Sequence, residues 1–303
     1  MMTPDPVCLP VPRYRGSTLA IAAPGNGPGN WVGAPSAILD GTAVLLAYRL
    51  RRPVEEGRGM DVVLARSEDH LHFDTVASVS KEPLGAESLE RPALVRSADG
   101  RWRLYLSCAT PGTKHWRVEL LEASQLENLP SAPPRVVLPG DAATAVKDPV
   151  IQLRDGTWEM WACLHPLDDP DATDRMWTAY ALSDDGVEWH WQGDALRPRP
   201  GAWDQRGTRI TAVWRRDGGW LGLYDGRASA EENFEERTGL ARGASPARLT
   251  ADAGGPIASS PHGGGALRYA CILPLPGGGH RLYYEAARED GAHELRTELV
   301  GAP

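Results

Sequence analysis

Three features that mark other classes of protein are missing from this 303-residue sequence: a long apolar run, an excess of basic residues and closely spaced cysteines. A helix that crosses a membrane needs about 18 or more consecutive apolar residues, and no stretch of the chain reaches that length. Proteins that bind nucleic acid non-specifically are generally basic, whereas this chain has 32 Lys and Arg against 40 Asp and Glu. We therefore expect neither a membrane span nor a nucleic-acid partner.

The four cysteines, Cys8, Cys108, Cys163 and Cys271, lie far apart and form no CxxC pair. Such spacing indicates neither a disulfide framework nor a zinc site, and the apolar strand patterns around Cys108 and Cys163 predict buried free thiols. The segment Met1–Arg15 lacks the continuous apolar stretch of a secretory signal. The sequence therefore predicts a cytoplasmic protein without a metal or another cofactor.

Amphipathic helix patterns are also lacking, and Phe occurs only twice, but 11 Trp, 33 Gly and 26 Pro are present. Trp fits the half-buried face of a β-sheet, and Gly and Pro form the tight turns between strands. This composition favours an all-β protein built from many short strands.

A repeat of about 57 residues runs through the chain. Pro35, Pro92 and Pro149 are evenly spaced, and each stands in an apolar run that is followed by Asp-Gly and a second apolar run. This pattern predicts a β-hairpin, and two later units keep it without the proline. The predicted first strands are Ala34–Leu39, Arg91–Val95, Asp148–Leu153, Ile210–Trp214 and Leu267–Leu275. Third strands are predicted at 61–66, 117–122, 177–182, 238–242 and 293–299, and short fourth strands at 76–79, 136–138, 188–191 and 247–249.

Repeats of four antiparallel strands at this period are typical of propeller blades, with a β-sandwich as the main alternative. Five such units fill the chain. The last unit ends after three strands, so a strand at Thr18–Ala23 is predicted to complete it and to close the ring. We predict an all-β fold, a five-bladed β-propeller of four-stranded antiparallel blades closed by an N-terminal strand, which forms a single domain over residues 1–303.

In a propeller the first strand of each blade lines the central channel, so residues near the starts of these strands are expected to meet at one mouth. Most of them are charged, which a purely structural channel does not require; a solvated funnel with internal salt bridges is the simpler alternative. The residues at these positions are Asn30, Trp31, Glu90, Arg91, Lys147, Asp148, Arg206, Thr208, Arg209, His262 and Arg268.

The strand that opens on Asp148-Pro149, the Asp-Gly hairpins and the turn Ala181–Trp189 resemble the five-bladed glycoside hydrolase superfamily of arabinanases, xylosidases, invertases, levansucrases and mannosyl-phosphorylases. The element Lys147-Asp148-Pro149 is similar to the one that holds the transition-state-stabilising Asp of the hydrolases. The run Gly219–Gly226 is similar to the Gly-Trp-Leu-x-x-Tyr-His-Gly of the phosphorylases, with Asp225 in place of their His. The resemblance implies a glycoside hydrolase-like enzyme that acts on a glycosidic bond in the channel.

Two positions depart from that family. Ala34 stands where the hydrolases place their base or nucleophile Asp, and Thr208-Arg209 stands where they place an acid Glu. Glycoside hydrolysis normally needs two carboxyl groups, one protonated and one ionised. The catalytic candidates that remain are Glu90, Asp148 and Asp225, with Asp204 in reserve. The nearby Arg91, Lys147 and Arg209 are expected to lower carboxylate pKa values, which suits a base or a stabilising group better than an acid.

Six residues are predicted to bind substrate: Trp31, Arg91, Lys147, Arg209, Arg227 and His262. Trp31 is either a stacking platform for a sugar ring or a core residue. The charged segment 225–237, with Arg227 and Glu232, either overhangs the channel or is a solvated loop. His262 is either a channel ligand or a turn residue. The loop 165–171 holds a His and three carboxylates but lacks the spacing of an EF-hand, so a cation there is the less favoured interpretation.

Three functions remain open at this point, because propellers host many unrelated activities. The first is a glycoside hydrolase-like enzyme with a small carbohydrate as its partner. The second is a catalytically altered propeller that binds a sugar-like or anionic ligand, or that serves a biosynthetic pathway. The third, a protein-interaction scaffold, would favour an uncharged channel and has little support. The oligomeric state does not follow from the sequence.

Overall fold

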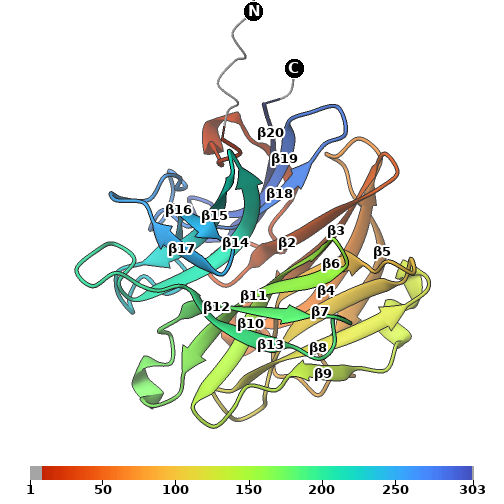
Figure 1. Ribbon diagram of the computed structural model, residues 1–303, viewed down its shortest axis with the longest axis horizontal. Coiled ribbons are helices and arrows are strands. Elements are labelled where there is room, and N and C mark those ends of the chain that lie inside the picture. Colours follow the sequence, from red (N-terminus) through yellow and green to blue (C-terminus); the bar gives the residue numbers. More distant parts are fainter. Residues whose placement is uncertain (1–8, 302–303) are drawn as a thin grey trace, which may run out of the picture.

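The computed structural model describes residues 9–301, and in that range the chain is all-β, with twenty strands and four short 3-10 helices. Three sheets are antiparallel, contain four strands each and follow the order of the sequence. Their strands are β6 (Leu89–Arg96), β7 (Trp102–Ala109), β8 (Trp116–Ala123) and β9 (Arg135–Leu138); β10 (Thr144–Arg154), β11 (Thr157–Pro166), β12 (Trp177–Ser183) and β13 (His190–Leu196); and β14 (Gly207–Arg216), β15 (Gly219–Arg227), β16 (Arg237–Ser245) and β17 (Arg248–Ala251). Figure 1 labels these strands.

The fourth sheet has eight strands and two halves that meet at a single parallel residue pair, Trp31 with His293. One half contains β2 (Trp31–Asp40), β3 (Ala43–Arg51), β4 (Gly59–Ser67) and β5 (Asp74–Ser80), and the other contains β18 (Leu267–Pro274), β19 (His280–Ala287), β20 (His293–Val300) and β1 (Thr18–Ile21). Strand β1 pairs antiparallel with β20, so the prediction that an N-terminal strand joins the last unit is confirmed. The 3-10 helices are η1 (Tyr14–Gly16), η2 (Val54–Glu56), η3 (Leu126–Ser131) and η4 (Pro170–Ala172).

The predicted hairpins are present, and one predicted strand is shifted. The segment 188–191 was expected to form a short fourth strand, but β13 begins at His190 and continues to Leu196. The preceding turn explains the shift, because the Asp185 carboxylate accepts hydrogen bonds from the backbone N–H groups of Val187 (2.8 Å) and Glu188 (2.9 Å). A side chain that binds the next backbone groups in this way stabilises a turn, and the strand begins after it.

Each first strand contains a β-bulge near its start. The register shifts lie between Gly33 and Ser36, Leu89 and Pro92, Lys147 and Val150, Ile210 and Ala212, and Arg268 and Cys271. A bulge leaves a residue unpaired and re-aims its side chain, and it accommodates a proline that cannot donate to the ladder. Ala34, Asp148 and Tyr269 occupy three of the bulges with positive φ angles of 52°, 54° and 55°. The repeat therefore places one re-aimed side chain per unit near the middle of the molecule.

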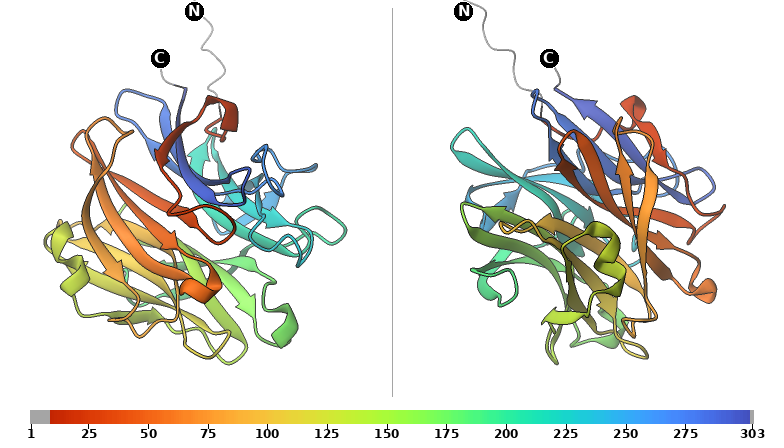
Figure 2. Two further views of the ribbon diagram at one scale, coloured as in Figure 1. Left: turned by 180° about the vertical axis from the view of Figure 1, so that it is seen from behind. Right: turned by 90° about the vertical axis from the view of Figure 1, so that its right-hand side faces the viewer.

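The first strands contact one another in a cycle, in which β2 meets β6, β6 meets β10, β10 meets β14, β14 meets β18 and β18 meets β2. Apolar side chains fill the space between the sheets in five separate clusters, each formed by two strand groups that follow one another in this cycle. Figure 2 shows the twisted sheets from two further sides. The core is thus divided among the inter-sheet spaces, and the charged residues near the strand starts lie where the first strands converge.

Cys108 and Cys163 are buried free thiols, as predicted, and Cys271 is also free. Cys8 and the first half of Met1–Arg15, the segment in which no secretory signal is predicted, lie outside the described residues. In the part of the chain that the structure describes, no helix has the length and apolar character to cross a membrane.

Candidate functional site

A cavity of about 350 Å³ lies where the first strands begin, and it is lined mainly by charged side chains. The cationic residues on its wall are Arg49, Arg51, Arg58, Lys114, Lys147, Arg209, Arg227 and Arg268, and the carboxylates are Glu87, Glu90, Asp174 and Glu236. Trp116, His165, Phe234 and Tyr269 also line it. The lining residues come from all five units of the repeat, so the cavity forms only when these units pack together.

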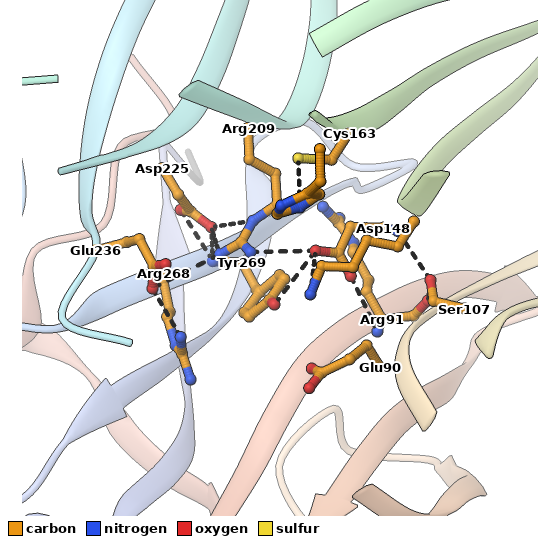
Figure 3. A network of polar contacts seen from close by, with 12 residues as sticks. Glu90, Arg91, Ser107, Asp148, Cys163, Arg209, Asp225, Glu236, Arg268 and Tyr269 are labelled. Atoms are coloured by element: carbon orange, nitrogen blue, oxygen red, sulfur yellow. Dashed lines mark hydrogen bonds and ion pairs between the residues drawn. The ribbon is translucent and has the colours of Figure 1, made fainter. Parts of the chain in front are cut away.

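Arg209, on β14, connects two of the predicted catalytic carboxylates. One of its terminal nitrogens donates to Asp148 (3.1 Å), and its Nε and other terminal nitrogen donate to Asp225 (3.1 and 2.8 Å). Its guanidinium lies 3.8 Å from the centre of the Tyr269 ring. Figure 3 shows Arg209 between the two aspartates, with Tyr269 beside it. The position at which the hydrolases that the sequence resembles carry an acid Glu therefore holds a cation that pairs with both aspartates.

Asp148 is fully buried in its bulge on β10 and is oriented by the adjacent unit. Its backbone N–H donates to Ser107 Oγ (2.8 Å), and its carboxylate accepts from the backbone N–H of Arg91 (3.3 Å). Burial raises the pKa of this carboxyl, but the charges of Lys147 and Arg209 outweigh burial and hold the pKa below its ordinary value. Asp148 is therefore ionised at neutral pH.

Asp225, on β15, is also fully buried but has a different electrostatic environment. Its two carboxylate oxygens accept from the backbone N–H of Tyr269 (3.1 and 3.0 Å), in addition to the bonds from Arg209. Burial outweighs the Arg209 charge and raises the pKa of Asp225 to about 6. The two aspartates thus differ in the direction of their pKa shifts although they share one guanidinium.

Glu90, on β6, lies on the cavity wall and is held by two arginines from β3. Arg49 forms an ion pair with one of its oxygens, and Arg51 donates to the other (3.1 Å). Burial raises the pKa of Glu90, but Arg49, Lys147 and Arg51 hold it well below the ordinary range. Burial also lowers the pKa of Arg51, to about 10. A carboxyl in this environment is a permanent anion and a poor proton donor.

A second group of buried charges continues the network, and sequence reasoning missed its members Arg49, Glu236 and Glu285. Glu285 accepts from Arg49 (2.8 Å), from Arg268 (2.7 Å) and from His293. Glu236 accepts from Arg268 (2.7 Å) and pairs with Arg227. The sequence did contain one signal for these residues, a charged side chain near the end of an apolar second strand. Arg49 and Glu285 both stand at such a position.

The structure brings four of the predicted site residues, Glu90, Lys147, Arg209 and Arg227, together on the cavity wall. Asp148 and Asp225 lie directly behind them, in contact with Arg209. Arg91 is buried and donates to the backbone oxygen of Thr211 (2.8 Å). Asp204, the reserve candidate, is buried elsewhere and accepts from Arg199 and Tyr224. Glu232 accepts from Arg237 and the Ala228 backbone, so it holds its own loop.

Trp31 and His262 are not on the cavity wall. The ring of Trp31 is 6% exposed, stacks on His293 (4.6 Å between ring centres) and contacts Phe234, and its Nε1–H donates to the Gly291 oxygen (3.1 Å). Its ring is therefore covered by protein. His262 lies beside Tyr14, with ring centres 5.9 Å apart, in a separate surface depression.

Trp116, at the start of β8, is the aromatic residue that the sequence analysis overlooked. Its half-buried ring lines the cavity, and the Lys147 ammonium lies 4.6 Å from its centre. The guanidinium of Arg58 lies 6.0 Å from the same ring. Cations at these distances interact favourably with an indole face. Trp116 and its cations therefore form a partly open platform in the cavity.

The loop 165–171 uses its polar groups within the protein. His165 Nδ1 pairs with the Thr173 backbone oxygen (3.0 Å), Asp168 pairs with Arg175, and Asp169 accepts from the Asp171 backbone. Burial lowers the pKa of His165 to about 3, so the ring is neutral at pH 7. Within residues 9–301, no group of three or more His, Cys, Asp or Glu side chains is arranged to hold a metal ion.

No protein-family model matches this chain, and a search of curated proteins finds no relative. Solved structures do match. A GH43_1 enzyme from Xanthomonas citri in complex with xylotriose is 12% identical with a TM-score of 0.67, over 94% of this chain and 91% of that one. A glycosyl hydrolase from Bacteroides ovatus is 14% identical with a TM-score of 0.61, over 94% and 89%.

A third match comes from the GH130 family of mannoside phosphorylases, described as containing glycoside hydrolases that target β-1,2 mannosidic linkages in Candida mannan. It is 15% identical with a TM-score of 0.60, over 97% of this chain and 91% of that one. The resemblance to the β-propeller glycoside hydrolases is thus confirmed at the level of the fold. At these identities the likeness shows the fold alone.

Proposed function

We propose that residues 1–303 form a single five-bladed β-propeller that takes a carbohydrate into the cavity at the starts of its first strands. In this arrangement each half of the eight-stranded sheet is one blade, and β1 completes the last blade by pairing with β20. The cycle of contacts among the five first strands and the five inter-sheet apolar clusters support this blade count.

The composition of the cavity wall is the observation that carries the carbohydrate proposal. A partly open indole, Trp116, lines a space of about 350 Å³ together with the charged donors Lys147 and Arg209. Sugar rings stack their C–H faces on aromatic side chains and accept hydrogen bonds through their hydroxyls, and small-molecule sites are typically concave spaces of about 300–1,000 Å³. The xylose and xylotriose named for two structural neighbours belong to the same chemical class.

The ion pairs of the wall carboxylates favour a protein that binds the carbohydrate and does not cleave it by the two-carboxylate route. That route requires a protonated acid on one side of the scissile bond and an ionised carboxylate on the other. Glu90 and Glu236, which line the cavity, are each paired with two arginines, and their pKa values are lowered. The pKa of Asp174, a third carboxyl on the cavity wall, is lowered as well.

Cleavage of a glycosidic bond is the second candidate, and one observation favours it. Asp148 has a lowered pKa while the pKa of Asp225 is raised to about 6, and divergent values in a neighbouring pair are typical of acid–base sites. Both carboxyls lie behind Arg209, so cleavage requires this guanidinium to move when substrate enters. A catalytic Asp148 would then act as the stabilising carboxylate.

A panel of neutral and charged oligosaccharides, measured by calorimetry and by product analysis on the same samples, tests both candidates. Binding without products supports the first, and products support the second. In the second case Asp148→Asn should abolish turnover and leave binding largely intact. Trp116→Ala should weaken binding, whereas Trp191→Ala, a change of an exposed Trp on β13, should not. Failure of every saccharide to bind would refute the carbohydrate proposal.

A further inference from the structure

The polar wall of the cavity carries more positive than negative charge, although the whole chain has a net charge of −8. Asp174 forms an ion pair with Arg206, and Glu87 forms one with Arg58, so the charges of these two pairs cancel. Apart from these pairs, the buried network around the cavity contains seven cations and five carboxylates. The cations are Arg49, Arg51, Arg91, Lys147, Arg209, Arg227 and Arg268, and the carboxylates are Glu90, Asp148, Asp225, Glu236 and Glu285.

The Lys147 side chain makes no hydrogen bond to the residues that the structure describes, unlike the six arginines of this network. Its side chain is 13% exposed, and the nearest carboxylate oxygen, on Asp148, lies 3.7 Å away, beyond hydrogen-bond distance. That oxygen already accepts from Arg209 at 3.1 Å. An ammonium has three N–H groups to donate, and burying them without acceptors is costly. The Lys147 ammonium lies in the cavity with donors available to a ligand.

A further donor points to the same conclusion. Lys114, two positions before Trp116, is exposed on the cavity rim. The chain has only three lysines, and two of them, Lys114 and Lys147, line this one cavity. An acceptor with a negative charge would bind the two ammonium groups and reduce the excess of positive charge.

We propose that the ligand of this cavity is a sugar that carries an anionic group, a carboxylate or a phosphate, with its ring on Trp116 and its anionic group at Lys147 and Lys114. This inference rests on the proposed carbohydrate function and specifies its substrate class. Trp116 accounts for the sugar and Lys147 for the charge, and the two side chains are in contact, with the ammonium 4.6 Å from the ring centre. A neutral sugar would leave the ammonium with only the charge of Asp148, which Lys147 shares with Arg209.

The test compares glucose, glucuronate, glucose 6-phosphate and inorganic phosphate by calorimetry on the full chain at constant ionic strength. The acidic sugars should bind at least about tenfold more tightly than glucose, because a hydrogen-bonded charge pair in a partly buried site typically contributes that much. Glucuronate and glucose 6-phosphate distinguish the carboxylate from the phosphate. Stronger binding at low salt should accompany the effect.

Variants separate this inference from the carbohydrate proposal. Lys147→Met and Lys114→Met should each weaken binding of the acidic sugars by a larger factor than binding of glucose. Lys114→Met changes an exposed residue, so it keeps the test open if Lys147→Met fails to fold. Arg248→Met, a change of an exposed residue on β17 outside the cavity lining, is the matched control and should change nothing.

Equal binding of glucose and the acidic sugars would overturn the anionic-ligand inference while the carbohydrate proposal stands. Inorganic phosphate that binds as tightly as the acidic sugars would overturn it as well, since the site would then hold a free anion. If no saccharide binds, both proposals fail together.

Discussion

Replacement of Arg209 by methionine is the most informative single change to the buried network. Methionine keeps much of the length of the side chain but removes the charge that Asp148 and Asp225 share. Both carboxylates are fully buried, so each would remain in the interior without its closest cation. Removal of one partner from a buried ion pair typically costs about 3–5 kcal/mol. We expect Arg209→Met to lower the free energy of unfolding by about that amount at pH 8.

The pH dependence of this loss tests the electrostatic cause. Without Arg209, the folded-state pKa of Asp225 rises further above the unfolded value, and Asp148 loses one of the two cations that hold its pKa below that value. At pH values between the unfolded and the folded pKa, the folded variant binds more protons than its unfolded chain. The free energy of unfolding of the variant therefore rises relative to that of the wild type as pH falls. Urea denaturation at pH 8 and pH 5.5 should therefore show a smaller deficit at the lower pH, with an unchanged m-value.

A second substitution serves as the control. Asp225→Asn in the Arg209→Met background should recover part of the lost stability, because it removes one uncompensated charge, whereas Asp225→Asn alone should destabilise the wild type. A deficit below about 1 kcal/mol, or one that is equal at both pH values, would show that the Arg209 ion pairs are not what stabilises this region.

Three more predictions follow from the same network and from the sheet arrangement. Stability of the wild type should begin to fall below about pH 6.5, where unfolded histidine but not folded His165 or His293 is protonated, although Asp225, with its folded-state pKa raised to about 6, offsets part of that loss. Stability should fall more steeply below about pH 4.5, because the folded-state pKa values of Glu90, Glu236 and Glu285 are lower than the unfolded ones; denaturation against pH measures this. Gly33→Ala should lower the melting temperature markedly, because a Cβ there would lie 2.5 Å from Glu285 Cβ; an unchanged melting temperature would contradict the packing. Removal of residues 1–21 should destabilise the chain by exposing the β20 edge that β1 covers, which thermal unfolding would detect.

Much of the fold could be predicted from local sequence patterns. Asp-Gly between two apolar runs specifies a hairpin through the backbone preferences of a few residues, so the strand positions follow from the chain itself. The even spacing of Pro35, Pro92 and Pro149 revealed the repeat, and the predicted pairing of the N-terminal strand agrees with β1 on β20. The shifted start of β13 shows the limit, since a turn held by the Asp185 side chain delayed the strand.

Part of the site was also predictable, because a repeat places equivalent residues at equivalent depths. Glu90, Lys147 and Arg209 could be assigned to one place since each stands near the start of a first strand, and the structure brings all three to the cavity wall. Their partners could not be assigned in the same way. Arg49 and Glu285 lie on second strands, and their pairing depends on how two halves of a sheet, more than 230 residues apart in sequence, pack together.

The choice between two tryptophans shows what only the tertiary structure decided. Trp31 and Trp116 are both strand-starting aromatics near charged residues, and composition does not distinguish them. Trp31 is covered by His293 and Phe234, which come from distant segments, whereas the ring of Trp116 remains partly open beside Lys147. Exposure is set by whatever packs against a side chain from elsewhere in the chain. A hairpin is specified by its own residues, but an open ring in a cavity is specified by the absence of neighbours, which the local sequence does not encode.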